Sequence, residues 1–223
     1  MPYRLDFADI TPVAGVAYYR HEDLLADGLR DRQQRAGQAV DAATCIRQFE
    51  PLLVPGYVQS PAWMKAVFSF NRDNVGGRPP EDVEQAVATR LERQQTLLNQ
   101  DTTRLHVVMA ETALRVWGLP GEVLAEQIDR LREAVLDERL QLGILPQRAA
   151  LPAPPNSQIT LYDGEQLRIE LDAGVLVMDD PDVIAGYRRS FDDIAAAALY
   201  GAAAGAYLAR LRAEIIDATN DRP

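Results

Sequence analysis

The run of residues 49–61 constrains this chain more than any other stretch, because nearly every residue in it restricts the backbone. It reads FEPLLVPGYVQSP, and each of its prolines fixes φ at about −65° and removes a backbone donor. Such a segment is excluded from a helix interior and from a central strand. Gly56 supplies the freedom in φ that a tight turn needs, and Ser60-Pro61 is typical of a helix start. The run therefore predicts a rigid turn that joins two structural parts.

The composition is that of an ordinary globular domain. The chain has 223 residues, of which 47% are hydrophobic and 25% are charged. Its net charge of −10 disfavours a surface that grips a nucleic-acid backbone. The single cysteine, Cys45, excludes an internal disulfide and fits a reducing compartment. The N-terminus lacks the apolar segment of a signal peptide, and no apolar stretch reaches the roughly 20 residues of a membrane span, so we expect a cytoplasmic protein.

The first part of the chain has a helical pattern. Apolar residues recur at spacings of three and four over residues 21–47, which predicts a long helix. We therefore divide the chain into an N-terminal segment with a helical arm, residues 1–48, and a body, residues 49–223. Similar patterns predict further helices over residues 61–70, 81–99, 121–136 and about 181–216, the last with a kink at Gly201.

Strand-like patterns are concentrated later in the chain. The Asp163-Gly164 pair between two apolar runs is a strong hairpin signal. Clustered strands that are joined by hairpins favour an antiparallel sheet. We therefore predict an α+β fold with a helical N-terminal part, a small antiparallel sheet of about five strands with one inserted helix, and a long C-terminal helix. The predicted strands cover residues 105–110, 140–144, 158–162, 167–171 and 175–178.

The motifs of common enzymes are absent from the sequence. It contains no nucleophile elbow, phosphate loop, zinc-protease helix or dinucleotide fingerprint. His106 alternates with apolar residues in a predicted strand, and we interpret it as a hydrogen-bonded sheet histidine. Asp180 precedes a proline and is interpreted as a helix N-cap rather than a metal ligand. The sequence thus predicts no catalytic residue, no metal site and no cofactor.

The strongest candidates for a binding site are one carboxylate and a pair of arginines. Glu111 directly follows an apolar strand, where an acid is costly to bury unless it meets water or a partner. Arg90 and Arg93 are three residues apart on a predicted helix and are suited to bidentate pairing with that carboxylate. Two interpretations stay open: an ion pair that ties the helix to the sheet, and a polar corner of a ligand pocket. The candidate ligand-binding residues are Tyr57, Gln59, Arg90, Arg93, Gln94 and Glu111.

The rigid turn and several later residues resemble a known family. The shared pattern is an aromatic-Glu-Pro turn, then Val-Pro-Gly, then Gln and Ser, followed in order by Arg90, Arg93-Gln94, Glu111, Leu114-Arg115, Gln127, Leu131 and Leu145-Pro146. From about residue 36 to residue 199, the chain resembles a domain of unknown function that follows an Xre-type helix-turn-helix in actinobacterial antitoxin-like regulators. Residues 1–35 are too short for that DNA-reading unit, and residues 147–157 lack the glycine- and histidine-containing pattern of the family.

The resemblance implies a regulatory module rather than an enzyme. We expect this module to bind a small molecule or a partner protein, with a second copy of the chain as one candidate, and to make no direct contact with nucleic acid or membrane. The alternative is a small biosynthetic enzyme that performs proton transfer at Glu111 and Arg93, assisted by Tyr57 and His106. A DNA-binding repressor is a third interpretation, which the net charge disfavours.

Overall fold

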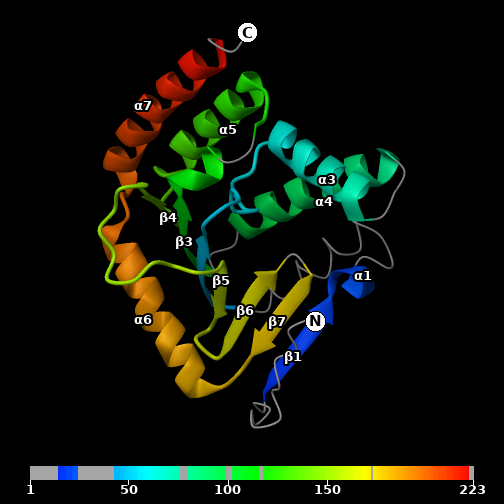
Figure 1. Cartoon of the computed structure of the whole chain (residues 1–223), viewed down its shortest axis with the longest axis vertical. Helices are drawn as coiled ribbons and strands as arrows, with labels where there is room; N and C mark the ends of the chain where they lie inside the picture. The colour runs from blue at the N-terminus through cyan, green and yellow to red at the C-terminus, as the bar shows by residue number, and fades with distance from the viewer. Residues whose placement is uncertain are drawn as a thin grey trace, which may run out of the picture.

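A computed structural model describes residues 15–24, 43–75, 80–98, 102–115, 118–171 and 173–220. A seven-stranded sheet with the order β1-β7-β6-β5-β2-β3-β4 forms its centre, and helices flank it (Figure 1). The strands are β1 (Val16–Arg20), β2 (Cys45–Glu50), β3 (Arg104–Ala110), β4 (Leu140–Leu145), β5 (Ile159–Tyr162), β6 (Gln166–Leu171) and β7 (Gly174–Met178). The helices are α1 (His21–Leu24), α3 (Pro61–Val75), α4 (Pro80–Leu98), the 3-10 helix η1 (Glu111–Leu114), α5 (Gly121–Ala134), α6 (Pro181–Ala197) and α7 (Gly201–Asn220).

The sheet is mixed, so the predicted small antiparallel sheet of about five strands is wrong. β2 runs parallel to β3, and β3 runs parallel to β4, while β1, β5, β6 and β7 make antiparallel pairs. The parallel pairs arise because α3 and α4 connect β2 to β3, and α5 connects β3 to β4, as crossovers rather than hairpins. The prediction recognised the helix between β3 and β4 but did not draw its consequence for strand direction.

The prediction also missed β1 and β2. β1 is an exposed edge strand with the sequence VAYYR, which shows no alternation of polar and apolar residues. β2 reads CIRQFE and buries the polar side chains of Gln48 and Glu50. The helix predicted over residues 21–47 is therefore wrong at its C-terminal end, where β2 begins at Cys45. Residues 21–24 do form the helix α1. Residues 25–42 of the predicted helix lie outside the described residues. β2 crosses the proposed boundary at residue 48, and the division into two parts stays a prediction.

Apolar side chains cover both faces of the sheet. On one face α6 packs Ile184, Phe191 and Ile194 against strand residues such as Phe49. On the other face α5, α7 and the first turns of α3 form a larger cluster that includes the fully buried Trp63. A smaller cluster joins α3 to α4. Among the described helices, none is both long enough and apolar enough to cross a membrane.

The proline-rich turn has the predicted structure. The Ser60 Oγ accepts a hydrogen bond of 3.3 Å from the Trp63 backbone N–H, so Ser60 caps α3, which begins at Pro61. The Gln127 side chain on α5 holds the turn from the other side. Its Oε1 accepts from the Ser60 N–H at 2.8 Å, and its Nε2 donates to the Val58 carbonyl at 2.9 Å. The turn is therefore fastened to both helices that flank it.

Two other local predictions are confirmed. Asp163 and Gly164 have φ values of 52° and 74°, and they form the turn that joins β5 to β6. Asp180 caps α6, because its Oδ1 accepts hydrogen bonds from the backbone N–H groups of Asp182 and Val183 at 2.9 and 3.1 Å.

The kink predicted at Gly201 is a complete break between α6 and α7. Leu199 lies between the two helices and pairs with Ile144 of β4, with N–H to carbonyl distances of 2.8 Å in both directions. Gly201 then has a φ of 52°, which a glycine adopts without strain, and begins α7. The neighbouring Tyr200 ring lies against Gly143, where an added Cβ would come within 2.7 Å of the ring.

Candidate functional site

A polar cluster interrupts the apolar face of the sheet around β2, β5 and β6. It consists of two rows of side chains that run across these strands. The strand register pairs Gln48 with Thr160 and Thr160 with Arg168, so these three side chains share one face of the sheet. We call the two rows together the polar sheet site; its members are Gln48, Thr160 and Arg168 in the first row and Glu50, Gln158 and Glu170 in the second.

Hydrogen bonds join the two rows. The Glu50 Oε1 accepts from the Gln48 Nε2 at 2.6 Å and from the Gln158 Nε2 at 3.0 Å. The Gln158 Oε1 accepts from the Glu170 backbone N–H at 3.2 Å. The Arg168 Nη2 donates to the Glu170 Oε1 at 2.9 Å. The second row is thus a continuous hydrogen-bonded line, and each end of the first row is attached to it.

Glu50 is an uncharged acid near neutral pH. Its side chain is buried, and loss of hydration together with the charge of Glu170 raises its pKa to about 8. The amide groups of Gln48 and Gln158 and the charge of Arg90 oppose the rise but do not cancel it. A carboxyl group with this pKa is mostly protonated at pH 7, which makes the centre of the site polar rather than anionic.

Two buried polar atoms of the first row have no hydrogen-bond partner. They are the Oε1 of Gln48, an acceptor, and the Nε of Arg168, a donor. Gln48 is only 7% exposed, so bulk water does not compensate for the missing bond. An unsatisfied buried polar group costs about 1–3 kcal/mol, and such groups are rare in folded proteins. The first row is therefore incomplete.

The predicted residues of the turn and of α4 do come together. The Arg90 Nη1 donates to the Gln59 Oε1 at 2.5 Å, and its guanidinium carbon lies 4.4 Å from the centre of the Phe68 ring. The Gln94 Nε2 donates to the Gly56 carbonyl at 2.7 Å and to the Gln59 carbonyl at 3.1 Å. Gln59, Arg90 and Gln94 therefore hold the turn against α4.

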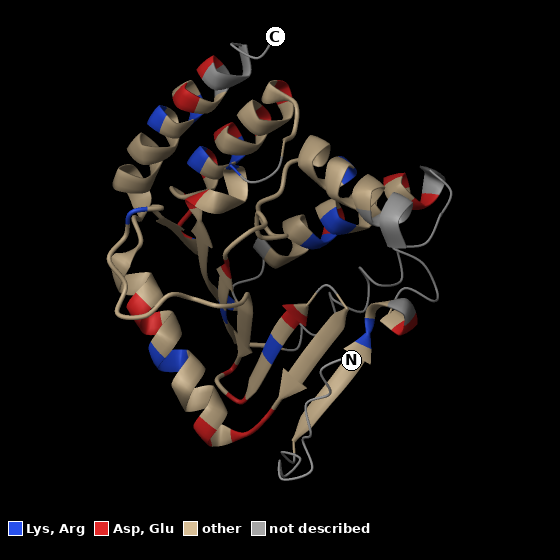
Figure 2. Cartoon of the chain, viewed as in Figure 1, with Lys and Arg blue, Asp and Glu red and all other residues tan. Residues whose placement is uncertain are grey.

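Tyr57 and Arg93 connect this turn to the polar sheet site. Tyr57 is buried, which raises the pKa of its phenol strongly; the neighbouring Tyr162 adds to the rise, and the charge of Arg93 opposes it. The charge of Arg93 also lowers the pKa of Tyr162 of β5, which burial raises. The charge of Arg90 likewise opposes the rise in the pKa of Glu50. Figure 2 shows basic positions on α4 and both acidic and basic positions on β6, the two elements that contribute charge here.

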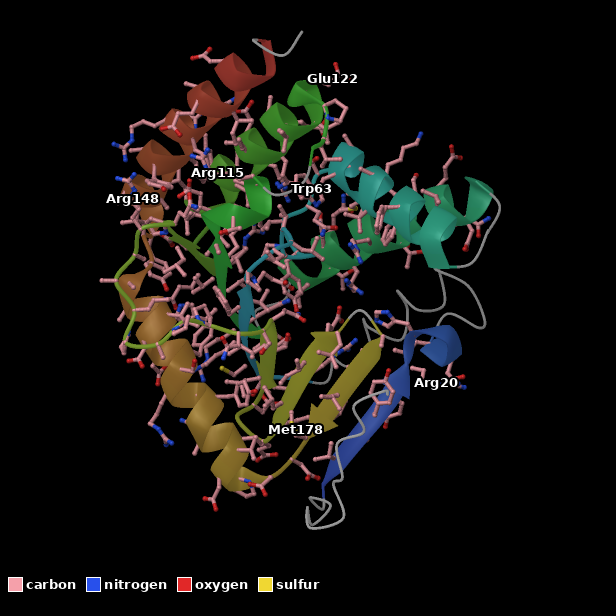
Figure 3. The ribbon with its side chains drawn as sticks, viewed as in Figure 1. Arg20, Trp63, Arg115, Glu122, Arg148 and Met178 are labelled. Atoms are coloured by element: carbon pink, nitrogen blue, oxygen red, sulfur yellow. The ribbon has the colours of Figure 1, made fainter. Side chains whose placement is uncertain are left out.

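Glu111 belongs to a different cluster, which corrects the expected pairing with Arg90 and Arg93. Its carboxylate accepts hydrogen bonds from the Arg115 Nε at 2.5 Å, from the Gln147 backbone N–H at 2.9 Å, and from the Tyr207 hydroxyl on α7. Arg115 also bridges to Glu214 of α7 at 2.7 Å and lies beside that helix in Figure 3. Burial alone would raise the pKa of Glu111, but these hydrogen bonds outweigh it and lower the pKa. We call this group the Glu111 cluster.

His106 lies on the opposite face of the sheet, under α6. Its Nε2 is 2.9 Å from the Tyr200 hydroxyl, and its ring meets Phe191 edge to face at 4.9 Å between centroids. Loss of hydration and the charge of Arg47 lower the pKa of His106. This arrangement agrees with the interpretation of a hydrogen-bonded sheet histidine.

The sequence reasoning missed the residues that make up the polar sheet site. In β6, Arg168 and Glu170 alternate with apolar residues, a pattern that equally fits a solvated face. In β2, Gln48 and Glu50 also have a spacing of two, but the helical pattern of residues 21–47 and the turn of residues 49–61 cover the rest of this segment. The signal that marks the site is polar residues at period two on two strands that become neighbours of β5.

The fold and the site define this protein as an α+β domain with a mixed sheet and a buried polar cluster on one face. The chain belongs to the family DUF5753, a domain of unknown function, whose family model matches residues 33–210. A search of curated proteins finds no match.

Solved structures give distant likenesses. TrmBL2, an archaeal chromatin protein, is 13% identical with a TM-score of 0.38, over 82% of this chain and 50% of that chain. Nuc of Salmonella typhimurium, a phospholipase D family member, is 10% identical with a TM-score of 0.40, over 83% of this chain and 96% of that chain. NucT from Helicobacter pylori is 8% identical with a TM-score of 0.39 and the same coverage. This chain therefore spans half of the chromatin protein.

Proposed function

We propose that this domain is a non-catalytic regulatory module that binds a small molecule at the polar sheet site. The observation that carries the proposal is the Oε1 of Gln48, a buried acceptor without a donor beside the hydrogen bonds of the second row. A ligand that donates to this atom relieves the cost of the missing hydrogen bond. The ligand gains binding energy because it supplies a hydrogen bond that the folded protein lacks at this atom.

The regulatory part of the proposal comes from the family. The pattern in and after the rigid turn resembles the domain that follows an Xre-type helix-turn-helix in antitoxin-like regulators of actinobacteria. In such a protein a sensor domain has to convert ligand binding into a change of contact with another domain or protein. The turn that carries Tyr57 is suited to this role, because hydrogen bonds attach it to α4 and α5 and its tyrosine lies beside the site.

The test is a thermal-shift screen of the full chain against a library of small polar metabolites at pH 7. A ligand present at 100 times its dissociation constant stabilises the folded state by about 2.7 kcal/mol, which raises the melting temperature by about 5 °C or more. Gln48→Met keeps the side-chain volume and removes the acceptor. Gln141→Met, at an exposed position of β4, is the control for the same exchange elsewhere in the sheet.

We expect compounds that stabilise the wild type and Gln141→Met, and that lose this effect in Gln48→Met. The proposal is wrong if no compound stabilises the protein, or if the effective compounds act equally on Gln48→Met. A partner protein is the other class of ligand that the resemblance admits, and it becomes the better interpretation in that case.

A proton-transfer enzyme is the second candidate function, and Glu50 is the observation that favours it. A buried carboxyl group with a pKa of about 8 is suited to general acid–base chemistry near neutral pH. Arg93 and Glu111, the pair expected first, lie in different clusters. Mass spectrometry of any stabilising compound after overnight incubation separates the two functions: the regulatory module returns the compound unchanged, and an enzyme converts it.

A further inference from the structure

The first row of the polar sheet site has its unpartnered atoms on both sides of one strand. Gln48 is on β2 and Arg168 is on β6, and both are cross-strand neighbours of Thr160 on β5, which lies between them. Neighbouring strands are about 4.8 Å apart, so the backbones that carry the two long side chains are separated by about 10 Å. These two atoms are the buried side-chain atoms without a partner among the described residues of this row.

The hydrogen bonds of the second row fix the orientation of the Gln158 amide. The Glu170 backbone N–H is an unambiguous donor, so the atom of Gln158 that receives it is the amide oxygen, and the Gln158 nitrogen then donates to Glu50. The Gln48 nitrogen donates to the same Glu50 oxygen at 2.6 Å, which leaves its own oxygen as the unpartnered atom. On the other side, Arg168 donates to Glu170 through its Nη2 and also hydrogen-bonds the Tyr162 hydroxyl, and its Nε is left without a partner.

Within the two rows the charges balance without a ligand, and the positive charges of Arg90 and Arg93 on α4 act on Glu50 and Tyr57 beside them. The Arg168 guanidinium is paired with the Glu170 carboxylate at 2.9 Å. Glu50 is surrounded by amide groups and is mostly protonated at neutral pH. A cationic ligand would add to this positive charge, and an anionic ligand would leave the buried Gln48 acceptor without a donor. A neutral group that both donates and accepts hydrogen bonds is favoured.

From this geometry we infer that the ligand carries a trans secondary amide that lies over Thr160, with its N–H directed at Gln48 and its C=O directed at Arg168. The inference rests on the proposed function and specifies the chemistry of the ligand. In a trans amide the N–H and the C=O point in opposite directions, which matches partners on opposite sides of β5. A carboxylate satisfies Arg168 and leaves Gln48 without a donor, whereas an ammonium group satisfies Gln48 and leaves Arg168 without an acceptor.

Small amides provide the direct test. N-methylacetamide is a trans amide; 2-pyrrolidinone holds its amide in the cis form, and N,N-dimethylacetamide has no N–H. A fragment of this size is expected to bind weakly, with a dissociation constant on the order of 1 mM to tens of mM, so titrations reach about 100 mM. The readout is the ¹H–¹⁵N signal of the Arg168 Nε–H, which an accepting carbonyl shifts, in the full chain at pH 7.

We expect a saturable shift of this signal with N-methylacetamide and affinities at least about tenfold weaker for the other two compounds, which corresponds to the loss of one good hydrogen bond. Gln48→Met weakens the binding of N-methylacetamide to a similar extent, and Gln141→Met leaves it unchanged. N-acetylalanine N-methylamide, which has two amides in a peptide backbone, identifies the source: tighter binding than N-methylacetamide indicates an extended peptide, and weaker binding a small metabolite.

Equal binding of the three small compounds, or an Arg168 signal that none of them moves, overturns the amide inference. The metabolite screen distinguishes a failure of the amide inference from a failure of the proposed function. Compounds that lose their effect in Gln48→Met while all amides fail leave the binding site in place and refute only the ligand class. If neither the library nor the amides bind, both proposals are wrong.

Discussion

Two buried glutamates at the ends of neighbouring parallel strands have opposite acid–base behaviour. Glu50 ends β2 and is 9% exposed, and Glu111 follows β3 and is 3% exposed. The pKa of Glu50 is raised to about 8, whereas that of Glu111 is lowered. Burial raises the pKa of both, so the difference lies in the partners: Glu50 meets amide groups, while Glu111 meets a guanidinium, a phenol and a backbone N–H.

This difference separates a structural carboxylate from a candidate site. In the Glu111 cluster the hydrogen bonds close around the charge and tie η1 to α7 and to the loop after β4. In the polar sheet site the hydrogen bonds stop at Gln48 and Arg168, each with an unpartnered atom. Burial of an acid is therefore a weak indicator of function by itself, and an incomplete set of partners is a stronger one.

The largest effect is expected when the closed cluster loses its acid. Glu111→Ala leaves the Gln147 N–H and the Tyr207 hydroxyl without their acceptor and removes a buried side chain, so the free energy of unfolding at pH 7 falls by about 3 kcal/mol. Because the folded pKa of Glu111 is lowered, its contribution is present above about pH 4.5 and disappears as the pH falls through the folded pKa. Urea denaturation of the wild type and the variant at pH 7 and pH 3 measures the loss of stability and its pH dependence. A loss of unfolding free energy below about 1 kcal/mol at pH 7 contradicts the closed cluster.

The opposite pH dependence is expected of Glu50→Gln. Between the unfolded pKa of about 4.5 and the folded pKa of about 8, the folded wild type holds a proton that the unfolded chain has lost, so its stability declines as the pH rises through this window. Glutamine does not titrate, so the stability of the variant relative to the wild type rises by on the order of 3 kcal/mol from pH 5 to pH 8. Urea denaturation at these two pH values checks this, and parallel stabilities would refute a raised pKa.

A smaller change is expected when one donor of the closed cluster is removed. Tyr207→Phe deletes the hydroxyl that bonds to Glu111 and keeps the ring, so the free energy of unfolding falls by about 1 kcal/mol. The same variant raises the pKa of Glu111, since the Tyr207 hydrogen bond is the strongest of the effects that lower it. Tyr19→Phe, at an exposed position of β1, is the control and changes stability little. Equal effects of the two variants would contradict the role of Tyr207.

The smallest change in stability is expected at an exposed carboxylate, which serves as the reference for the buried ones. Asp192 of α6 forms an ion pair with Arg47 at 3.0 Å, but its side chain is 64% exposed. Exposed ion pairs contribute about 0–1 kcal/mol, so Asp192→Asn is expected to lower the free energy of unfolding by less than about 0.5 kcal/mol in urea at pH 7. A loss as large as that of Tyr207→Phe would show that burial is not what distinguishes these acids.

Local signals in the sequence predicted much of this fold and little of its long-range pairing. The Asp163-Gly164 turn and the Asp180 cap depend on neighbouring residues, and both were found. β2 was missed because a central strand that buries Gln48 and Glu50 breaks the usual apolar pattern, and its apolar residues also fitted a helical spacing. The direction of β2, β3 and β4 follows from crossovers that a strand pattern alone does not reveal.

For the candidate site, too, the sequence indicates local contacts but not contacts between distant parts of the chain. Gln59, Arg90 and Gln94 were grouped correctly, since the rigid turn presents a short set of groups to one helix. Glu111 was assigned the wrong partners, because the hydroxyl of Tyr207 that bonds to it is 96 positions away in the chain. Gln48 and Arg168 become a pair only through their common neighbour Thr160, and no feature of the sequence indicates that register.

The link between Leu199 and Ile144 also affects how the sheet ends. A long outer strand normally offers a row of unpaired peptide groups to other molecules, which promotes aggregation. Here the chain uses its own inter-helix segment to occupy both peptide groups of Ile144 on β4. A foreign strand that approached β4 would find the peptide groups of Ile144 already bonded, so β4 does not present an uninterrupted row of free peptide groups.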